Sequence, residues 1–312
     1  MQKASRGAAY CASTWNVLMM TRVSSVGKRR GSLTPFAFLA PALVLYAFFT
    51  VYPVARSLLL SLQRNVDGEI RWAGLGQYQR LLGDDILKQA LANTGIFLVL
   101  QVPIMLVSAL LLAVALNSKR FPFRAVFRSA YFLPSIMSLV AVGVLFRVLL
   151  NEDLGFVNYV LRSLGLSGVP WITHPWWAKV TVMILLTWRY TGFMMVIYLS
   201  GLQSIPDELY EAAEIDGSSG ANSFWFITLP LLRPTVLFTT VLSTIGVLQI
   251  FDEALIVTRG GPANETLTIG LYLYQTAFQS VDFHYAAAIS WVLVFLIGAL
   301  SIVQLKIGER EV

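Results

Sequence analysis

The residues that could do chemistry lie in two places along the chain. Residues 203–233 hold five acidic side chains and a single basic one, Arg233. Arg189 stands inside a long apolar run, between Trp188 and Tyr190. A charged side chain within a membrane-spanning run is costly and therefore indicates a functional site, and the aromatic neighbours could stack on a ligand or form hydrogen bonds with it. The five acidic residues are Asp207, Glu208, Glu211, Glu214 and Asp216.

Enzymatic and metal chemistry has little support in the rest of the chain. A single cysteine, Cys11, allows no internal disulfide and no cysteine metal cluster, and two histidines, His174 and His284, are too few for a histidine-rich site. No segment matches the G-x4-G-K-[ST] phosphate loop, so the chain cannot bind ATP by that means. An intramembrane hydrolase would need a nucleophile and a base within the apolar runs, and both histidines lie outside them. We therefore expect no catalytic residue, no metal site and no cofactor.

The composition is that of a membrane protein. Of the 312 residues, 56% are hydrophobic and only 13% are charged, and the mean hydropathy is +0.68. Soluble domains carry about 25% charged residues, so the composition argues against a cytosolic enzyme. The net charge of +6 does not indicate a nucleic-acid partner, because ten of the 23 basic residues lie in two short segments, 1–33 and 117–128, that flank apolar runs.

Six apolar runs are long enough to cross a bilayer, which requires about 20 residues in helical form. Each run is apolar on all faces, whereas a helix at a water-facing surface has a polar face. In hydrocarbon a helix satisfies its own backbone N–H and C=O groups. The sequence therefore predicts an all-α integral membrane protein with six transmembrane helices. The predicted spans are approximately residues 35–55, 94–116, 129–150, 180–202, 235–257 and 285–305.

The basic residues indicate how the chain is oriented. Residues 1–33 contain no acidic residue, and the loop between the second and third spans is also purely basic. Because short cytoplasmic loops are enriched in Lys and Arg, we expect the N-terminus in the cytoplasm, and six crossings return the C-terminus there. Residues 1–33 are expected to form a disordered cytoplasmic arm and residues 34–312 the transmembrane domain. The basic residues concerned are Lys3, Arg6, Arg22, Lys28, Arg29 and Arg30, followed by Lys119, Arg120, Arg124 and Arg128.

The acidic segment lies between the fourth and fifth spans, on the cytoplasmic side by this orientation. Its acidic residues do not serve orientation, which suggests another purpose. Ser204 is a good helix N-cap, and Asp207 three residues later resembles a capping box. Gly217 stands where a helix would end on a residue with positive φ. We expect a second helical turn through Asn222–Ile227 that stops at Pro230.

The segment resembles a known signature, E-A-A-x3-G-x9-I-x-L-P, that marks the permease subunits of bacterial ABC importers. The spacing is complete and falls between the expected pair of spans. The residues that match are Glu211, Ala212, Ala213, Gly217, Ile227, Leu229 and Pro230.

Further segments resemble the carbohydrate-uptake branch of this family, specifically its maltose-type first permease. The resemblance runs from about Thr34 to Lys306. The sequence departs from many relatives at His284, where they have Gly, and it lacks the C-terminal Lys-Gly tail of the second permease type. The similar segments are Ala40–Ala42, Tyr52–Pro53, Leu199–Pro206 and Thr258–Pro262.

The resemblance implies a role for the acidic helix and a set of partners. In the family this helix docks in a groove of a cytoplasmic ATPase subunit, where Ala212 and Ala213 would allow close approach, Gly217 would provide the bend and Glu211 could pair with a basic group. The alternative is an ordinary solvated helix that Gly217 merely caps. The implied assembly in the bacterial inner membrane is a heterodimer with a second permease, two ATPase subunits and an extracytoplasmic sugar-binding protein, surrounded by lipid and without nucleic acid.

The resemblance also implies a sugar or oligosaccharide site near the bilayer midplane, in the fourth and fifth spans. Arg189 lies at about that depth, nine residues from the outer start of its span at about 1.5 Å per residue. Its alternative role is an ion pair with Asp252 or Glu253, and Trp188 could equally serve helix packing. Glycerol phosphate is the alternative substrate, because its phosphate would suit Arg189. The pathway candidates are Trp188, Arg189, Tyr190, Ser243, Gln249 and Asp252.

A secondary transporter is the rival class of protein. It would need internal repeats or a chain of intramembrane acids, and the sequence displays neither. It would also leave the acidic cytoplasmic segment without an explanation.

Overall fold

The computed structural model describes residues 34–118 and 122–309. The expected cytoplasmic arm, residues 1–33, lies outside the described residues. The chain divides into two compact units, Met1–Arg56 and Ser57–Val312. The regular secondary structure of the described residues is helical except for one short hairpin.

The first unit contains the first predicted span. α2 (Thr34–Tyr46), the π-helical turn η1 (Ala47–Val51) and α3 (Tyr52–Ser61) follow one another without a break in helical backbone. Phe38–Ser61 is apolar and long enough to cross a membrane. An apolar helix of this length satisfies its own backbone hydrogen bonds and suits a lipid environment.

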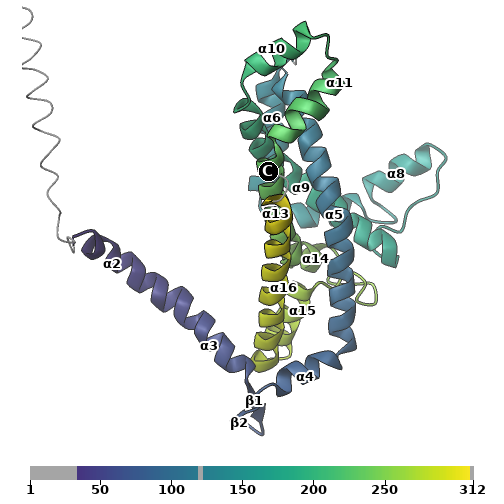
Figure 1. Ribbon diagram of the computed structural model, residues 1–312. Helices are drawn as coiled ribbons and strands as arrows, with labels where there is room; N and C mark the ends of the chain where they lie inside the picture. The colour runs from purple at the N-terminus through teal and green to yellow at the C-terminus, as the bar shows by residue number, and fades with distance from the viewer. Residues whose placement is uncertain (1–33, 119–121, 310–312) are drawn as a thin grey trace, which may run out of the picture. The chain divides into compact units, whose positions relative to one another are not determined.

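The second unit is built on three long helices, α5 (Asp85–Asn117), α9 (Pro175–Gln203) and α16 (Phe283–Glu309) (Figure 1). Each is apolar and long enough to span a bilayer. They contain the predicted second, fourth and sixth spans, which are confirmed as long apolar helices. Their apolar composition on every face is why they extend well beyond the average helix of a soluble protein.

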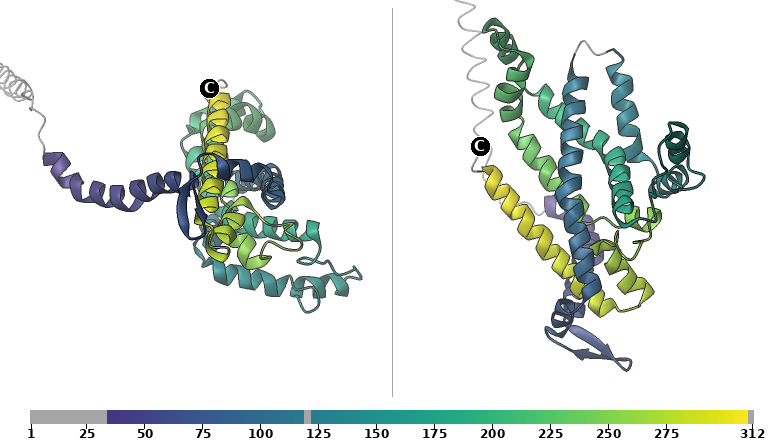
Figure 2. Two further views of the ribbon diagram at one scale, coloured as in Figure 1. Left: turned by 90° about the horizontal axis from the view of Figure 1, so that it is seen from below. Right: turned by 90° about the vertical axis from the view of Figure 1, so that its right-hand side faces the viewer.

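Small elements lie at the two ends of this unit (Figures 1 and 2). At one end are a hairpin of β1 (Gln63–Val66) and β2 (Glu69–Trp72) and the short helix α4 (Gly76–Leu82). The hairpin turns at Asp67 and Gly68, which both have positive φ, as an Asp-Gly turn favours. At the opposite end are α10 (Asp207–Ile215) and α11 (Gly220–Ser223), in the acidic segment.

The third predicted span is not one straight helix. α6 (Arg124–Ile136) and α7 (Leu139–Leu149) are bent by 99° relative to each other. The expectation of a continuous helix over residues 129–150 is therefore wrong. The two linking residues have extended backbone, and Pro134 lacks the N–H that would support the last turn of α6. α8 (Phe156–Ser163) follows α7.

The prediction of one continuous helix over residues 235–257 is also wrong for the residues after Leu248. α13 (Arg233–Leu248) ends early, and α14 (Asp252–Val257) is a separate short helix. The break is supported from outside the run, because Thr268 donates a hydrogen bond of 2.6 Å to the carbonyl oxygen of Ile250. Such a tertiary contact leaves no trace in the local hydrophobic pattern.

On its other side, α13 continues the acidic segment through η2 (Phe224–Thr228) and α12 (Leu229–Leu231). The run Gly220–Leu231 is bent by 67° relative to α13. The run therefore ends at Leu231, one residue beyond Pro230, which agrees with the predicted stop at this proline. By length and composition, the described residues contain four spans, or six if each bent pair is one span.

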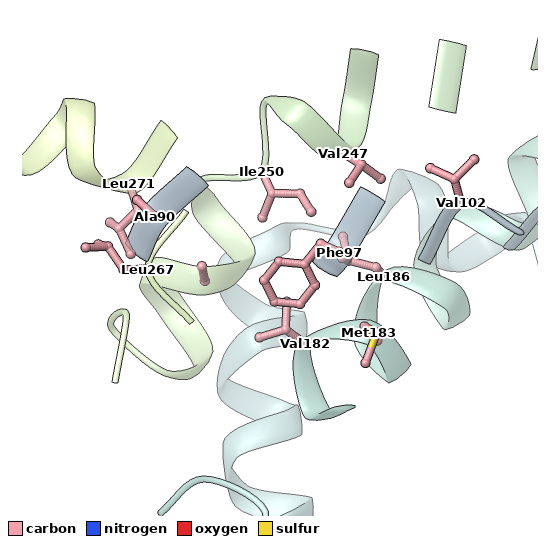
Figure 3. Close-up of a cluster of buried hydrophobic side chains, with 11 residues drawn as sticks. Ala90, Phe97, Val102, Val182, Met183, Leu186, Val247, Ile250, Leu267 and Leu271 are labelled. Carbon is pink, nitrogen blue, oxygen red and sulfur yellow. The ribbon is translucent and has the colours of Figure 1, made fainter. Parts of the chain in front are cut away.

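A buried cluster joins α5, α9 and α13 to α15 (Ile269–Tyr274) (Figure 3). Phe97 of α5 is fully buried and lies between Val182 and Leu186 of α9 and Ile250 of the break. η3 (Gln275–Gln279) connects α15 to α16. The cluster fixes the break after α13 against the long helices, which positions the site described next.

Candidate functional site

The acidic helix α10 begins later than the sequence indicates. Ser204 ends α9, and its hydroxyl donates to the carbonyl oxygen of Gly201 at 2.7 Å. Pro206, with extended backbone, is the N-cap of α10, and Asp207 is the first residue of the helix. The predicted N-cap at Ser204 and its capping box are therefore wrong. Ser204 has αR backbone angles, whereas an N-cap residue needs an extended backbone.

The predicted bend at Gly217 is confirmed. Its φ is +74°, and its N–H donates to the carbonyl oxygen of Glu214 at 3.1 Å. The N–H of Ser218 donates to the carbonyl oxygen of Ala213 at 2.8 Å. These two bonds form a Schellman motif, in which the C′ residue adopts the left-handed conformation that glycine favours. The motif turns the chain sharply from α10 into α11.

The acidic loop, which comprises α10, α11 and η2, is accessible to solvent on its two short helices and contains a hydrogen bond between α10 and η2. None of the residues of α10 or α11 is buried. The hydroxyl groups of Tyr210 on α10 and Thr228 on η2 are hydrogen-bonded at 2.9 Å. Of the seven signature residues, Glu211, Ala212 and Gly217 are exposed and the other four are half-buried. Those half-buried residues are Ala213, Ile227, Leu229 and Pro230.

A cavity of about 740 Å³ lies between α5, α6, α9 and α13. The non-helical residues after α13 form part of its wall. Trp188 does not line this cavity; its ring packs against Phe146 of α7 at 5.6 Å between centroids. The other pathway candidates do line it, namely Arg189, Tyr190, Ser243, Gln249 and Asp252.

Arg189 has an unusual environment within the cavity wall. Its Nε and Nη1 atoms are buried and have no hydrogen-bond partner among the described residues. None of the ion pairs in the described part of the chain includes Arg189, so neither alternative partner, Asp252 or Glu253, forms a salt bridge with it here. Glu253 instead accepts a hydrogen bond of 2.8 Å from the Tyr190 hydroxyl. Buried donors without acceptors are costly, so the site is suited to a ligand that supplies acceptors.

The cavity also contains residues that sequence reasoning missed. Gln101 of α5 is fully buried in the wall, and a polar residue inside an apolar run was the available signal. Three aromatic residues line the cavity from α6, α9 and the break, and nothing in the sequence separates them from packing residues. These aromatic residues are Phe132, Phe193 and Phe251.

The segment after α14 is anchored to the long helices. The ammonium group of Lys179, only 4% exposed, is paired with the carboxylate of Glu265. The amide of Asn93 donates to the carbonyl oxygens of Asn264 at 2.8 Å and Leu267 at 3.0 Å. These contacts hold the segment against α5 and α9. Because α14 contributes Asp252 and Glu253 to the cavity wall, these contacts also help to fix that part of the wall.

A family model described as the binding-protein-dependent transport system inner membrane component matches residues 89–307. The lactose transport system permease protein LacF of Rhizobium radiobacter is 45% identical over 291 residues, 92% of this chain and 97% of LacF. The arabinooligosaccharides transport system permease protein AraP of Halalkalibacterium halodurans is 36% identical over 275 residues, 88% of this chain and 87% of AraP. A chain of a bacterial ABC transporter involved in the import of the polysaccharide alginate shares the fold, with a TM-score of 0.77 at 23% identity, covering 89% and 95% of the two chains.

The matched residues include both the acidic loop and the cavity wall. The resemblance inferred from the signature is confirmed, and with it the assignment as a transport subunit and not an enzyme. The chain therefore belongs to the binding-protein-dependent transport system inner membrane components, the multi-pass permease subunits of ABC importers.

Proposed function

We propose that this chain is one of two permease subunits in an ATP-driven importer that takes a sugar or oligosaccharide from an extracytoplasmic binding protein. The observation that carries this proposal is the 45% identity, over 92% of the chain, to a lactose permease. The second permease and two ATPase subunits complete the assembly. The first helix of this chain, Phe38–Ser61, is apolar and long enough to cross the membrane, and lipid and these partners would surround it.

In the proposed orientation each bent pair of helices crosses the membrane once, which gives six crossings and places both termini in the cytoplasm. The basic residues at the end of α5 and the start of α6 support this orientation. Arg128 donates to the carbonyl oxygen of Leu116 at 2.7 Å, so basic groups cap this end of the bundle. α10 then faces the cytoplasm, where an ATPase subunit can reach it.

α10 is proposed to be the coupling helix that docks on the ATPase, with Glu211 directed at a basic group of that subunit. Two features would transmit its movement, the Gly217 bend and the hydroxyl pair Tyr210–Thr228. Both connect α10 to the helical run that continues into α13. Because α13 ends in the cavity wall, a movement of α10 would reach the substrate site through packed helices.

The cavity is proposed to bind a neutral sugar. The unpartnered Nε and Nη1 of Arg189 would donate to sugar oxygens, and Asp252, Ser243 and Gln249 would receive or donate further hydrogen bonds. The aromatic wall offers ring faces for stacking. Glycerol phosphate is less suitable, because Asp252 and Glu253 in the same wall would repel an anion.

The experiment is purification in mild detergent with the genetically linked partners, followed by reconstitution with the loaded binding protein. We expect the purified complex to contain one copy of this chain, one second permease and two ATPase subunits. After reconstitution, we expect uptake of a labelled disaccharide only when ATP is present on the side of the vesicle membrane that carries the ATPase subunits. Uptake driven by an ion gradient without ATP would make the protein a secondary transporter. ATP-driven uptake of glycerol phosphate, with none of a disaccharide, would select the alternative substrate.

A further inference from the structure

Residues 150–174, which connect α7 to α9 and include α8, form an excursion from the long helices. Buried polar groups hold this excursion together. The side chain of Asn158, 1% exposed, donates to the carbonyl oxygens of Glu152 and Val169, each at 2.9 Å. Its amide oxygen accepts from the N–H of Val169 at 3.0 Å and from Nε1 of Trp171 at 2.9 Å. All the hydrogen-bonding capacity of this one amide is thus used inside the excursion.

Two charged residues complete this internal frame. The carboxylate of Glu152 accepts from the backbone and the hydroxyl of Thr173, at 2.9 and 2.7 Å. The guanidinium of Arg162 donates to the carbonyl oxygens of Glu152 at 2.9 Å and Asp153 at 3.1 Å. The excursion is therefore a preorganised body and not a loose loop.

Its outside, in contrast, is apolar. Phe156, Tyr159 and Val160 stand at positions i, i+3 and i+4 of α8, on one face, and all three are exposed. Leu154, 93% exposed, and Leu164, 70% exposed, extend this face beyond the helix. A polar inside with an apolar outside is the reverse of what water favours, and a patch of this kind marks an interaction surface.

The apolar face continues the exposed surface of α7. Val144 and Val148 of α7 are exposed, and only six residues separate the end of α7 from the start of α8. A groove of about 400 Å³ lies between the two helices, and Figures 1 and 2 show the excursion projecting sideways from the long helices. The groove is lined by Val148, Leu149, Leu154, Phe156 and Tyr159, together with the charged Asp153 and Arg162.

We propose that α8 lies in the interfacial layer of the bilayer with its apolar face in lipid, and that a phospholipid acyl chain fills the groove between α7 and α8. The groove is continuous with the exposed apolar surface of α7, which is part of a candidate membrane span, and this continuity favours lipid over a protein partner. A zwitterionic headgroup would complement Arg162 and Asp153, which have opposite charges, and tyrosine is enriched at this depth of membranes. The proposed orientation of the chain decides only the leaflet, which would be the outer one.

The test is spin-label accessibility in the complete importer, with cysteine-free partner subunits, in lipid nanodiscs. In a Cys11→Ser background, a nitroxide is attached at Tyr159→Cys and, as a second site, at Phe156→Cys. Val144→Cys, an exposed position of α7 within a candidate membrane span, is the reference for lipid, and Glu69→Cys on the exposed hairpin is the reference for water. Molecular oxygen concentrates in lipid, whereas nickel ethylenediamine diacetate remains in water.

We expect both α8 sites to give an oxygen-to-nickel collision ratio close to that of Val144→Cys and several-fold above that of Glu69→Cys. A ratio close to that of Glu69→Cys would place α8 in water and overturn the proposal. Low collision rates with both reagents would show that a protein covers the face, and would overturn it as well. Neither result depends on sugar transport or ATP hydrolysis, so the proposed function would be unaffected.

Discussion

Arg189 is the residue on which the chemistry of the cavity depends. A guanidinium group within an apolar bundle normally pairs with a carboxylate, yet here two acidic residues line the same cavity and neither forms an ion pair with it. Glu253 is already engaged by the hydroxyl of Tyr190. The arrangement leaves Nε and Nη1 of Arg189 available to a ligand with oxygen acceptors, while its guanidinium group lies 5.4 Å from the centre of the Tyr190 ring.

Arg189→Ala should reduce sugar uptake by about 10-fold or more, because each hydrogen bond from a charged group contributes about 1.5 to 3 kcal/mol. Assembly with the partner subunits should remain normal. The measurement is uptake by the reconstituted importer at equal protein content. Trp188→Phe is the matched control on the same helix, and it should retain uptake because Trp188 packs against Phe146 outside the cavity.

The double change Arg189→Ala with Asp252→Asn separates ligand binding from a structural ion pair. If the two residues formed a structural ion pair, removal of both charges would restore uptake, because no buried charge would be left without a partner. If Arg189 binds the sugar, the double variant would remain inactive. We expect no restoration of uptake, and recovery to the wild-type rate would contradict the binding role.

Asp84 illustrates a residue whose role is structural. Its carboxylate accepts from the N–H groups of Ile86 and Leu87 and from the hydroxyls of Tyr272 and Tyr285. Burial alone would raise the pKa of Asp84, but these hydrogen bonds outweigh it and hold the pKa below its ordinary value. The group therefore stabilises the fold at pH values above its unfolded pKa of about 3.9, and the contribution is lost as the pH falls through the lower pKa of the folded state.

Asp84→Ala should lower the melting temperature at neutral pH, since loss of an N-cap alone costs about 1 kcal/mol. As the pH is lowered through 4, the wild type should lose stability faster than the variant, and their melting temperatures should converge. Thermal unfolding of the detergent-solubilised complex between pH 7 and pH 3 measures this. A constant difference across the range would show that ionisation of Asp84 is irrelevant to stability.

At the scale of elements, the sequence predicts the long helices and not their interruptions. Runs such as α5, α9 and α16 follow directly from apolar composition over more than 25 residues. The break at Met137 follows Pro134 inside an otherwise apolar run, and the break after Leu248 is held by a contact from another element, the bond from Thr268 to the carbonyl oxygen of Ile250. The cavity wall is built at one of these breaks, which is why its residues could be predicted only in part.

The acidic loop was predictable for a different reason. Gly217 adopts positive φ because the local chain requires it, and glycine is the residue that signals this need. Ser204 is a good N-cap by residue type, but the end of α9 uses it instead. Residue type predicts the bend, whereas the exact helix start depends on where the preceding helix ends.

The hydroxyl pair between Tyr210 and Thr228 joins two elements of the coupling loop. Tyr210→Phe should preserve the ring packing while removing this bond, and we expect the ATPase activity to be less tightly coupled to uptake. More ATP should be consumed per sugar transported, with the amount of assembled complex unchanged. An unchanged ratio would show that the bond does not contribute to transmission. Thr228→Val, which removes the other hydroxyl, should have the same effect.

At the scale of the whole molecule, the coupling site and the substrate cavity occupy different parts of one continuous helical path. α10 turns at Gly217 into the run Gly220–Leu231, this run bends by 67° into α13, and α13 ends at the cavity. The proposed mechanism requires that this path transmits the closure of the ATPase subunits. It also requires that the membrane helices assemble without help from the loop, since they insert by their own hydrophobicity.

The most direct test of this mechanism is ATP hydrolysis by the reconstituted importer, with and without loaded binding protein, for wild type, Gly217→Asn and Gly217→Val. A side chain at Gly217 would meet no other atom within 4 Å, so any penalty arises from its φ of +74° alone. Asn tolerates this conformation, whereas a β-branched residue is strained by about 1 to 3 kcal/mol. We predict that Gly217→Asn keeps the stimulation by loaded binding protein and that Gly217→Val assembles normally but loses it. Equal stimulation in all three proteins would contradict the role of the acidic loop as the transmission element.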